Sequence, residues 1–451
     1  MTTRRSRQRE EEELEAAIAE SLKDTKGSGK VNGSGSRASG DSLSGGVSGE
    51  ECLSYSETQK DADLRLNLNL PMGEPLIKAL QMLFYPISLL FTYSGLEFLL
   101  CGVMWTSLVP DVCKHYICNC AWKLYSQVHR ITLGNRTGLH ESLSYEAHAL
   151  TTMMWPFRLF PMTLKRMRFG LCNIGFNFPY DGSLRTRQLE GIHGEYLGKM
   201  VLVNDVDDDA DAASKKVIFW IYGGAFLSGD VDGNVPLANH YGKAAGKNVF
   251  VVNYQLCPEG AIMDAFADVL NAYEWLLASD FVDTAEDITV FGISSGGGLA
   301  LKLMQHIHAS EDFDEQVSAG VLICPWVNYN IDNLPRSLKE NTKHDLVVHG
   351  GVYDYVLPLA SAMAMVDGAP QYKTVSPIFG SMRGLPNLLV ISSNHEVTTD
   401  ETYELVGKCK EAGVNVVHHS QNYLSHVFAL LPFLPEAKIA MAVIEGFLKR
   451  S

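Results

Sequence analysis

Six short apolar runs recur through the second half of the chain, and polar or glycine-rich segments separate them. Between two of the runs, residues 264–279 repeat their apolar positions every three to four residues, which is typical of an amphipathic helix. Runs that are apolar at consecutive positions predict strands that are buried on both faces of a sheet. The pattern therefore predicts an α/β fold with a mostly parallel central sheet and helices on both faces. The predicted strands span residues 217–222, 249–254, 288–293, 319–326, 388–393 and 415–420.

A longer apolar stretch at residues 79–110 contains one charged residue, Glu97. About 20 such residues are enough to cross a bilayer, so one interpretation is a spanning helix. Pro86 and Gly95 would instead allow a hairpin that lies in one leaflet. Burial as a cap helix is the third alternative, and the pattern does not choose among them.

Composition divides the rest of the chain. Residues 25–70 are rich in glycine and serine and hold too little apolar surface to build a core, which predicts a disordered linker. The predicted regions are a charged helix at 1–24, this linker, a membrane-associated segment at 71–125, N-terminal and cap helices at 126–189, and an α/β domain at 190–451.

Residues 10–24 read EEEELEAAIAESLKD, an acidic run followed by apolar residues at helical spacing. Leu14 and Ile18 share one stripe of such a helix, with the small residues Ala17 and Ser21 beside it. The pattern resembles a ubiquitin-interacting motif, in which a single helix lays its apolar stripe on ubiquitin. It implies ubiquitin as a partner and a cytosolic N-terminus. The alternative is an acidic amphipathic helix on a disordered tail.

Charge and cysteine spacing exclude several other classes of protein. The formal net charge is −15, whereas nucleic-acid binding needs clustered lysine and arginine, so we expect no nucleic-acid partner. The nine cysteines show the spacing of neither a disulfide scaffold nor a zinc site. The acidic segment 204–216 lacks the glycine and distal glutamate of an EF-hand loop and predicts a solvated hairpin connection. We therefore expect neither a metal nor a cofactor.

Residues 288–303 read ITVFGISSGGGLALKL, an apolar run that passes into a helical pattern at two serines. Gly292 and Gly296 bracket Ser294 in the motif G-x-S-x-G. Between a strand and a helix this motif is a nucleophile elbow, whose sharp turn thrusts the serine above the sheet. It predicts Ser294 as a nucleophile and Ser295 as a backbone N–H donor to an oxyanion.

A serine nucleophile needs a base, and the base needs an acid to orient it. The fifth predicted strand leads to Glu396 and Asp400, and the sixth leads to His426. The carboxyl ends of parallel strands meet at one edge of a sheet, so these side chains are expected near the elbow. His426 is the predicted base. Glu396 is the preferred acid because Asp400 begins a helical pattern and could cap it, but Asp400 stays open.

The segment WIYGGAFLSG at residues 220–229 follows the first predicted strand, and its glycines let backbone amides approach a substrate oxygen. Together with the elbow, the Y-x-L-x-P-E turn at 254–259 and the E-V-T-T-D-E turn at 396–401, it resembles the hormone-sensitive lipase-like branch of the α/β-hydrolase superfamily. That branch includes arylacetamide deacetylase-like and neutral cholesterol ester hydrolase-like carboxylesterases. The resemblance covers about residues 190–450.

The resemblance implies an α/β-hydrolase fold with a helical cap that forms an acyl pocket. It implies Ser294 as nucleophile, His426 as base and Glu396 as acid. The implied oxyanion hole consists of Gly223, Gly224, Ala225 and Ser295.

The chain departs from the branch at three places. Tyr222 stands where a histidine usually begins the H-G-G-G loop, and Glu396 stands where aspartate is usual. Ile293 and Ser295 replace the common flanks of the nucleophile, where alanine usually follows the serine. The oxyanion donors are backbone groups and glutamate serves in related triads, so activity is still expected.

The implied function is a carboxylesterase or lipase-type serine hydrolase that cleaves an apolar acyl ester through an acyl-enzyme. An amidase or deacetylase with the same triad is one alternative, and an impaired hydrolase-fold scaffold for ubiquitinated partners is another. The long apolar stretch adds an expected association with membrane lipid, at the endoplasmic reticulum or a lipid-body membrane.

Overall fold

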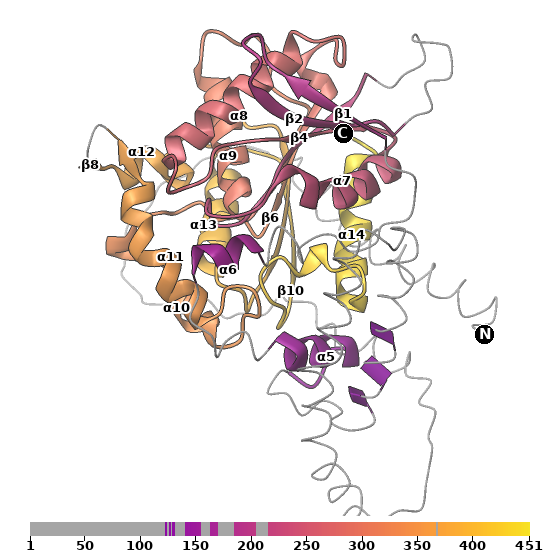
Figure 1. Ribbon diagram of the computed structural model, residues 1–451, viewed down its shortest axis with the longest axis vertical. Coiled ribbons are helices and arrows are strands. Elements are labelled where there is room, and N and C mark those ends of the chain that lie inside the picture. The colour runs from indigo at the N-terminus through magenta and orange to yellow at the C-terminus, as the bar shows by residue number, and fades with distance from the viewer. Residues whose placement is uncertain are drawn as a thin grey trace, which may run out of the picture.

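An eight-stranded sheet forms the centre of the computed structural model, in the order β1-β2-β4-β3-β5-β6-β9-β10 (Figure 1). The structure describes residues 122–123, 126–127, 129–130, 140–154, 163–169, 185–203, 215–366 and 369–451. The strands are β1 (Thr186–Glu190), β2 (Tyr196–Val201), β3 (Val217–Ile221), β4 (Asn248–Val252), β5 (Ile288–Ile293), β6 (Ala319–Ile323), β9 (Asn387–Ser393) and β10 (Val416–Gln421); β7 (Met365–Val366) and β8 (Ala369–Pro370) form a separate pair.

The pairing is parallel from β4 through β10, and β2 pairs antiparallel with both β1 and β4. All six predicted strands are present, and every residue of β3 through β6 is buried, which explains why these strands read as continuous apolar runs. The predicted fold class is thereby confirmed.

Two features of this sheet differ from the sequence-based expectation. The hairpin of β1 and β2 was not predicted, since four of the five residues of β1 are exposed and the strand carries little apolar pattern. The acidic segment 204–216 leads from β2 towards β3. Because β2 lies beside β1 and β4 rather than β3, the prediction of a hairpin connection there is wrong.

Helices cover both faces of the sheet, as Figure 1 shows. On one side α7 packs with α14, and on the other α8 packs with α9, with α13 beside β9 and β10. The covering helices are α7 (Val231–Ala245), α8 (Ile262–Leu277), α9 (Ser295–Ala309), α13 (Thr399–Glu411) and α14 (Pro435–Leu448). Short 3-10 turns lie at η4 (Ala285–Asp287), η5 (Ile331–Asn333), η6 (Asn341–Lys343), η7 (Pro377–Phe379) and η8 (Phe428–Leu430).

An insertion between β6 and β9 supplies further helices near the carboxyl ends of the strands. Two helices from the N-terminal part of the chain lie at the same end of the molecule in Figure 1. The insertion holds α10 (Arg336–Glu340), α11 (Gly350–Met363) and α12 (Tyr372–Val375), and the earlier part of the chain holds α5 (Tyr145–Met154) and α6 (Leu164–Phe169).

Several predictions concern residues outside the described ranges. These are the ubiquitin-binding residues Leu14, Ala17, Ile18 and Ser21, the linker, and the apolar stretch 79–110. Within the described ranges, no helix has both the length and the apolar character that a membrane crossing requires. The predicted domain boundaries stay predictions.

Candidate active site

Ser294 lies at the turn between β5 and α9 with a φ of 52°, a left-handed conformation that is uncommon for a residue with a side chain. Three backbone hydrogen bonds of 2.9 Å hold it there. The Ser294 amide donates to the carbonyl of Ile323, and the Ser294 carbonyl accepts from the amides of Gly297 and Trp326. The loop after β6 therefore helps to fix the strained nucleophile turn.

Gly296 is required by close packing rather than by its own conformation. A Cβ atom at this position would lie 2.2 Å from the carbonyl oxygen of Tyr222 and 2.3 Å from that of Ile221. The second glycine of G-x-S-x-G thus allows the end of β3, and the loop that follows it, to lie directly against the elbow.

The structure brings Ser294, His426 and Glu396 together in one hydrogen-bonded series. His426 Nε2 lies 2.8 Å from Ser294 Oγ, and His426 Nδ1 lies 2.7 Å from Glu396 Oε2. Glu396 follows β9, and His426 follows β10, so the parallel strands deliver both to the edge where β5 ends. This arrangement lets the imidazole take a proton from the serine hydroxyl.

The carboxylate of Glu396 is fully buried, and both of its oxygens accept hydrogen bonds. Its Oε2 also accepts from the amide of Thr398 at 2.9 Å, and its Oε1 accepts from the Thr398 hydroxyl at 2.7 Å. Burial lowers the pKa of His426, but the hydrogen bond that its ring donates to Glu396, together with the charges of Glu396 and Asp345, outweighs burial, so the pKa is raised above its usual value.

Asp345, which no sequence motif marks, is a second buried carboxylate at the histidine loop. Its Oδ2 accepts from the backbone amide of His426 at 2.8 Å, while its Oδ1 accepts from the amides of Val347 and Val348, both at 2.9 Å. Burial raises the pKa of Asp345 above its usual value. The side chain ties the insertion between β6 and β9 to the loop that carries His426.

The alternative acid, Asp400, does not contact the histidine. It lies in the first turn of α13, where its Oδ2 accepts from the amide of Ser337 at 2.8 Å. Glu401, its neighbour, is fully buried, and its Oε2 accepts from the amides of Val327 and Asn328 at 2.7 and 2.8 Å. Of the three acidic residues in this turn, Glu396 is therefore the one hydrogen-bonded to the imidazole.

Residues 222–229, here called the oxyanion loop, lie against the elbow. A Cβ atom on Gly223 would meet the Ser294 Cβ at 3.0 Å. Among the described residues, none accepts a hydrogen bond from the amides of Gly224, Ala225 or Ser295. These groups are thus available as donors to a substrate oxygen, although the sequence alone could not show their orientation.

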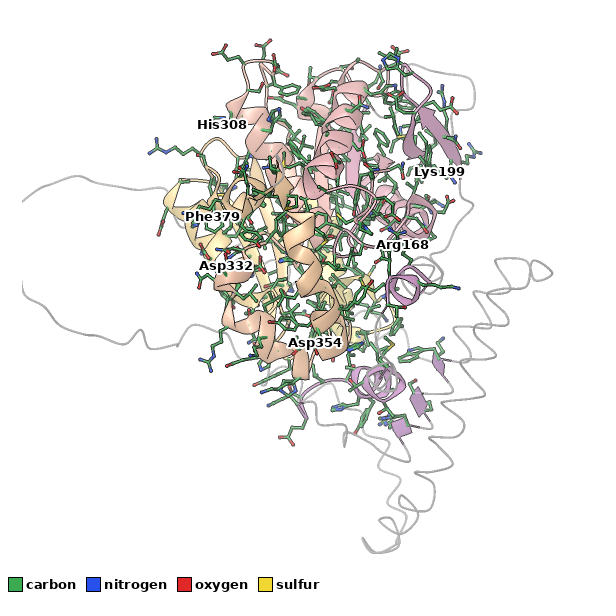
Figure 2. All side chains as sticks on the ribbon, turned by 60° about the vertical axis from the view of Figure 1, so that its left-hand side comes forward. Arg168, Lys199, His308, Asp332, Asp354 and Phe379 are labelled. Carbon is green, nitrogen blue, oxygen red and sulfur yellow. The ribbon has the colours of Figure 1, made fainter. Side chains whose placement is uncertain are left out.

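Arg168, labelled on α6 in Figure 2, holds the oxyanion loop from outside. Its Nε donates to the carbonyl of Leu227 at 2.9 Å and its Nη2 to the carbonyl of Cys257 at 3.1 Å. The guanidinium also pairs with Glu259, and its hydrogen bonds lower the pKa of that carboxyl to about 2. An arginine in an unremarkable basic stretch thereby links the N-terminal helices to the site, which sequence reasoning missed.

A cavity of about 60 Å³ opens at Ser294 and His426, and its wall is largely apolar. The oxyanion loop, the loop after β6, α10, α11 and the Glu396 turn all contribute to it. The lining residues are Ala225, Ser294, Trp326, Leu338, Val348, Val352, Tyr353, Val356, Leu357, Val397, Thr398 and His426. The insertion between β6 and β9 thus forms part of the wall of the cavity above Ser294.

Cys324, Glu396 and His426 form a cluster within the described residues whose atoms lie within 4.8 Å of one another and could in principle ligate a metal. Both imidazole nitrogens and both carboxylate oxygens already take part in hydrogen bonds. Burial, with the nearby charge of Glu396, raises the pKa of the Cys324 thiol well above its usual value. A thiol must lose its proton to bind a metal. The raised pKa of Cys324 therefore disfavours metal binding by this cluster.

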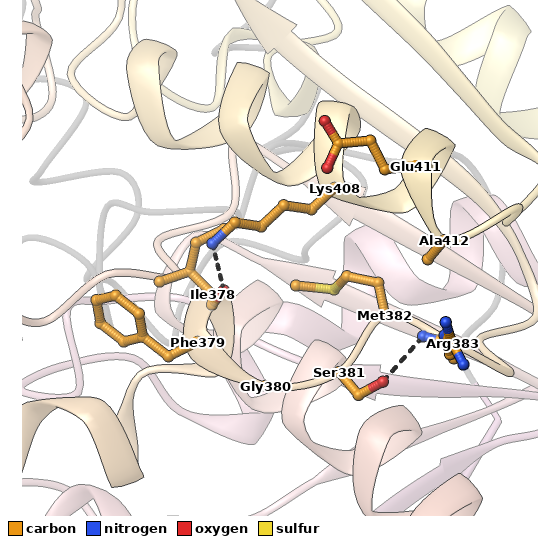
Figure 3. A pocket seen from close by; sticks show the side chains of 9 residues that line it. All are labelled: Ile378, Phe379, Gly380, Ser381, Met382, Arg383, Lys408, Glu411 and Ala412. Atoms are coloured by element: carbon orange, nitrogen blue, oxygen red, sulfur yellow. Dashed lines mark hydrogen bonds between the residues drawn. The ribbon is translucent and has the colours of Figure 1, made fainter.

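A second pocket of about 310 Å³ lies at the amino ends of β9 and β10, between the segment before β9 and the end of α13 (Figure 3). Lys408 Nζ donates there to the carbonyl of Ile378 at 3.0 Å, and Ser381 Oγ accepts from the amide of Arg383 at 3.2 Å. This pocket is larger than the cavity at Ser294, but its lining residues include no histidine that could act as a base for Ser381.

The chain is similar to known proteins with the α/β-hydrolase fold. Residues 218–430 match the family model of the alpha/beta hydrolase fold. An esterase of Acinetobacter venetianus is 27% identical over 64% of this chain and 89% of its own length. A carboxylesterase/phospholipase of Mycobacterium tuberculosis is 30% identical over 53% of this chain and 63% of its own length.

Solved structures show the same fold. The crystal structure of a mutant esterase is 26% identical, with a TM-score of 0.56 over 66% of this chain and 95% of that one. An esterase from the bacterial hormone-sensitive lipase family is 21% identical, with a TM-score of 0.52 over 84% of this chain and 99% of that one, a likeness that concerns the fold alone. The chain therefore contains a domain with the α/β-hydrolase fold, which is the fold that the sequence predicted.

Proposed function

We propose that the protein is a serine hydrolase that cleaves an apolar acyl ester through an acyl-enzyme formed on Ser294. The observation that carries the proposal is the continuous hydrogen-bonded series from Ser294 through His426 to Glu396 beside an apolar cavity. The broader class, a carboxylic ester hydrolase, is confirmed by the relatives named as esterases and carboxylesterase.

In the first half of the reaction, Ser294 Oγ attacks the carbonyl carbon of the ester while its proton passes to His426 Nε2. Glu396 holds the imidazole in the required tautomer and stabilises the positive charge that it gains. The negative charge on the carbonyl oxygen is met by amides of the oxyanion loop and of Ser295. When the bond to the alcohol breaks, His426 returns the proton to the leaving oxygen, and the acyl group remains on Ser294.

In the second half, a water molecule replaces the alcohol. His426 takes a proton from the water as its oxygen attacks the acyl carbon, and the same amides bind the second oxyanion. The bond to Ser294 Oγ then breaks, His426 protonates the serine, and the carboxylic acid leaves. An amide substrate would follow the same path and differ only in its leaving group.

The cavity favours a short acyl chain. Its volume of about 60 Å³ is far below the roughly 300–1,000 Å³ of common ligand sites. We expect turnover of p-nitrophenyl esters to peak at short chains and to fall as the chain lengthens, and we expect esters to be cleaved faster than the matched anilides. A peak at long chains would contradict the short-chain assignment.

The test of the nucleophile is labelling of the full chain by a fluorophosphonate probe, with ester turnover measured in parallel. Ser294→Ala should abolish labelling and lower kcat by roughly 10⁴- to 10⁶-fold. Ser381→Ala is the matched control, because this exposed serine in the pocket of Figure 3 lies away from His426. Labelling that persists in Ser294→Ala would disprove the assignment.

Ubiquitin binding is a separate proposal that is supported only by the pattern of residues 10–24. Full-length protein should retain ubiquitin on a pull-down, and replacing Ala17 and Ser21 with bulkier residues should abolish it. Retention that survives both changes would refute the motif and remove the support for a cytosolic N-terminus.

Membrane association is likewise proposed from the apolar stretch at residues 79–110. The full chain should float with liposomes, whereas a chain without this stretch should remain in the soluble fraction. Imaging should place the full chain at the endoplasmic reticulum or at lipid bodies, and a diffuse distribution would refute that location.

A further inference from the structure

The hydroxyl of Ser295 is a buried hydrogen-bonding group that the proposed reaction does not use. The residue is fully buried, and its Oγ accepts from the amide of Phe226 in the oxyanion loop at 3.3 Å. Tyr254 supplies a second hydrogen bond to the same loop. Its Oη donates to the carbonyl of Tyr222 at 2.8 Å, and the two tyrosine rings stack with centroids 4.4 Å apart.

These contacts are two separate hydrogen bonds to the oxyanion loop, one from each side chain. Tyr254 has a single hydroxyl proton and donates it to the carbonyl of Tyr222, while the Ser295 oxygen accepts from the amide of Phe226. The two bonds hold the loop on either side of Gly223, Gly224 and Ala225.

The segment between these two hydrogen bonds has backbone conformations that residues with side chains rarely adopt. Gly224, Ala225 and Phe226 have φ values of 137°, 56° and 61°, and the last two carry side chains in the left-handed region. A Cβ atom on Gly224 would lie 2.0 Å from the carbonyl oxygen of Ser228. Such conformations persist only where the surroundings enforce them.

We propose that Ser295 and Tyr254 form a positioning pair that holds the oxyanion loop in its strained, donor-ready conformation. The inference rests on the proposed ester hydrolase function. Ser295 would then act twice, because its own amide is one oxyanion donor while its side chain fixes the loop that supplies the others. This role accounts for a serine at a position where the resembled branch usually has alanine.

The test compares the full-length wild type with Ser295→Ala, Tyr254→Phe and the double variant, using p-nitrophenyl butyrate. Loosened oxyanion donors should lower kcat of Ser295→Ala by roughly 10- to 100-fold and leave KM within about twofold. A trifluoromethyl ketone, to which Ser294 adds to give a bound oxyanion, should lose affinity by the same factor as kcat/KM. The double variant should be worse than either single variant, because each change removes a separate hydrogen bond to the same loop.

Ser376→Ala is the matched control, because Ser376 is another buried serine whose Oγ accepts a backbone amide, that of Tyr329 at 2.8 Å. It should lower Tm without changing kcat. Tyr254→Phe keeps the ring stack and removes only the hydrogen bond to the carbonyl of Tyr222, so it tests the positioning role even where Ser295→Ala folds poorly. The positioning role is refuted by an active wild type whose Ser295→Ala and Tyr254→Phe variants keep kcat and ketone affinity within twofold. A wild type without turnover or labelling would overturn the proposed function, and this inference with it.

Discussion

Glu396 and Glu401 lie five residues apart in the same turn, and both side chains are fully buried. Glu396 accepts one hydrogen bond from the imidazole of His426 and two from Thr398, so both of its oxygens have partners. Glu401 binds two backbone amides through Oε2, and among the described residues its Oε1 has no hydrogen-bond partner. Burial alone therefore does not identify the acid of a triad.

The difference extends to charge. Burial raises the pKa of Glu401 well above its usual value, and the two amides only partly offset it. The negative charge near His426 comes from Glu396 and Asp345, which together keep the pKa of the imidazole raised. In the proposed reaction Glu396 thus supports proton transfer. Glu401 instead supports the loop after β6, which binds the Ser294 backbone through Trp326.

The largest effect that separates the two glutamates is expected for Glu396→Gln. An amide there can donate to Nδ1 and favour the wrong imidazole tautomer, so kcat should fall by roughly 10³- to 10⁴-fold. His426 acts as a base only when neutral, so the rate rises with pH through its raised pKa. Removing the carboxylate should move this acid limb to lower pH, as a profile of kcat/KM would show. A loss below tenfold would remove Glu396 from the triad.

A smaller effect is expected for Asp345→Asn. Asparagine keeps only one oxygen for the amides of Val347, Val348 and His426, so the histidine loop should lose alignment and kcat should fall by roughly 10- to 100-fold. Loss of the charge should also shift the acid limb to lower pH, by less than Glu396→Gln does. An unchanged pH profile would show that Asp345 acts through packing only.

The sequence could predict the site residues that directly follow strands. Glu396 and His426 were predicted because each follows an apolar run, and parallel strands bring their carboxyl ends to one edge. The apolar runs also predicted the parallel strands of the sheet. They did not predict β1, because four of its five residues are exposed and it has little apolar pattern.

The supporting residues could not be predicted because their roles arise from contacts between distant segments. Asp345 lies 81 residues before His426, in an insertion without a motif. The Ser295 hydroxyl reaches the Phe226 amide 69 residues away, and nothing local marks it as an acceptor. The structural role of Glu401 was not predicted, although the residue belongs to the motif that contains Glu396. The sequence does not reveal which side chains of a turn are buried.

Glu401→Gln should change stability more than rate. Glutamine keeps an acceptor for Val327 and Asn328, so kcat should stay within about tenfold and the acid limb should not move. A raised pKa means that the folded state holds its proton more tightly, so wild type loses stability as pH rises from about 4.5 towards that pKa. The variant has no such loss. Urea unfolding should therefore show the cost of the substitution shrinking between pH 5 and pH 8, and a constant difference would contradict the raised pKa.

The smallest effect is expected for Asp400→Asn, the variant that tests the other candidate acid. Asp400 and Ser337 exchange hydrogen bonds at the start of α13, 2.8 Å from amide to carboxylate and 3.0 Å from the Asp400 amide to the hydroxyl. The asparagine oxygen can still accept from Ser337, so the free energy of unfolding should change by about 1 kcal/mol or less. Because Asp400 does not reach His426, kcat and its pH profile should remain within twofold of wild type. A loss comparable to that of Glu396→Gln would reverse the assignment of the acid.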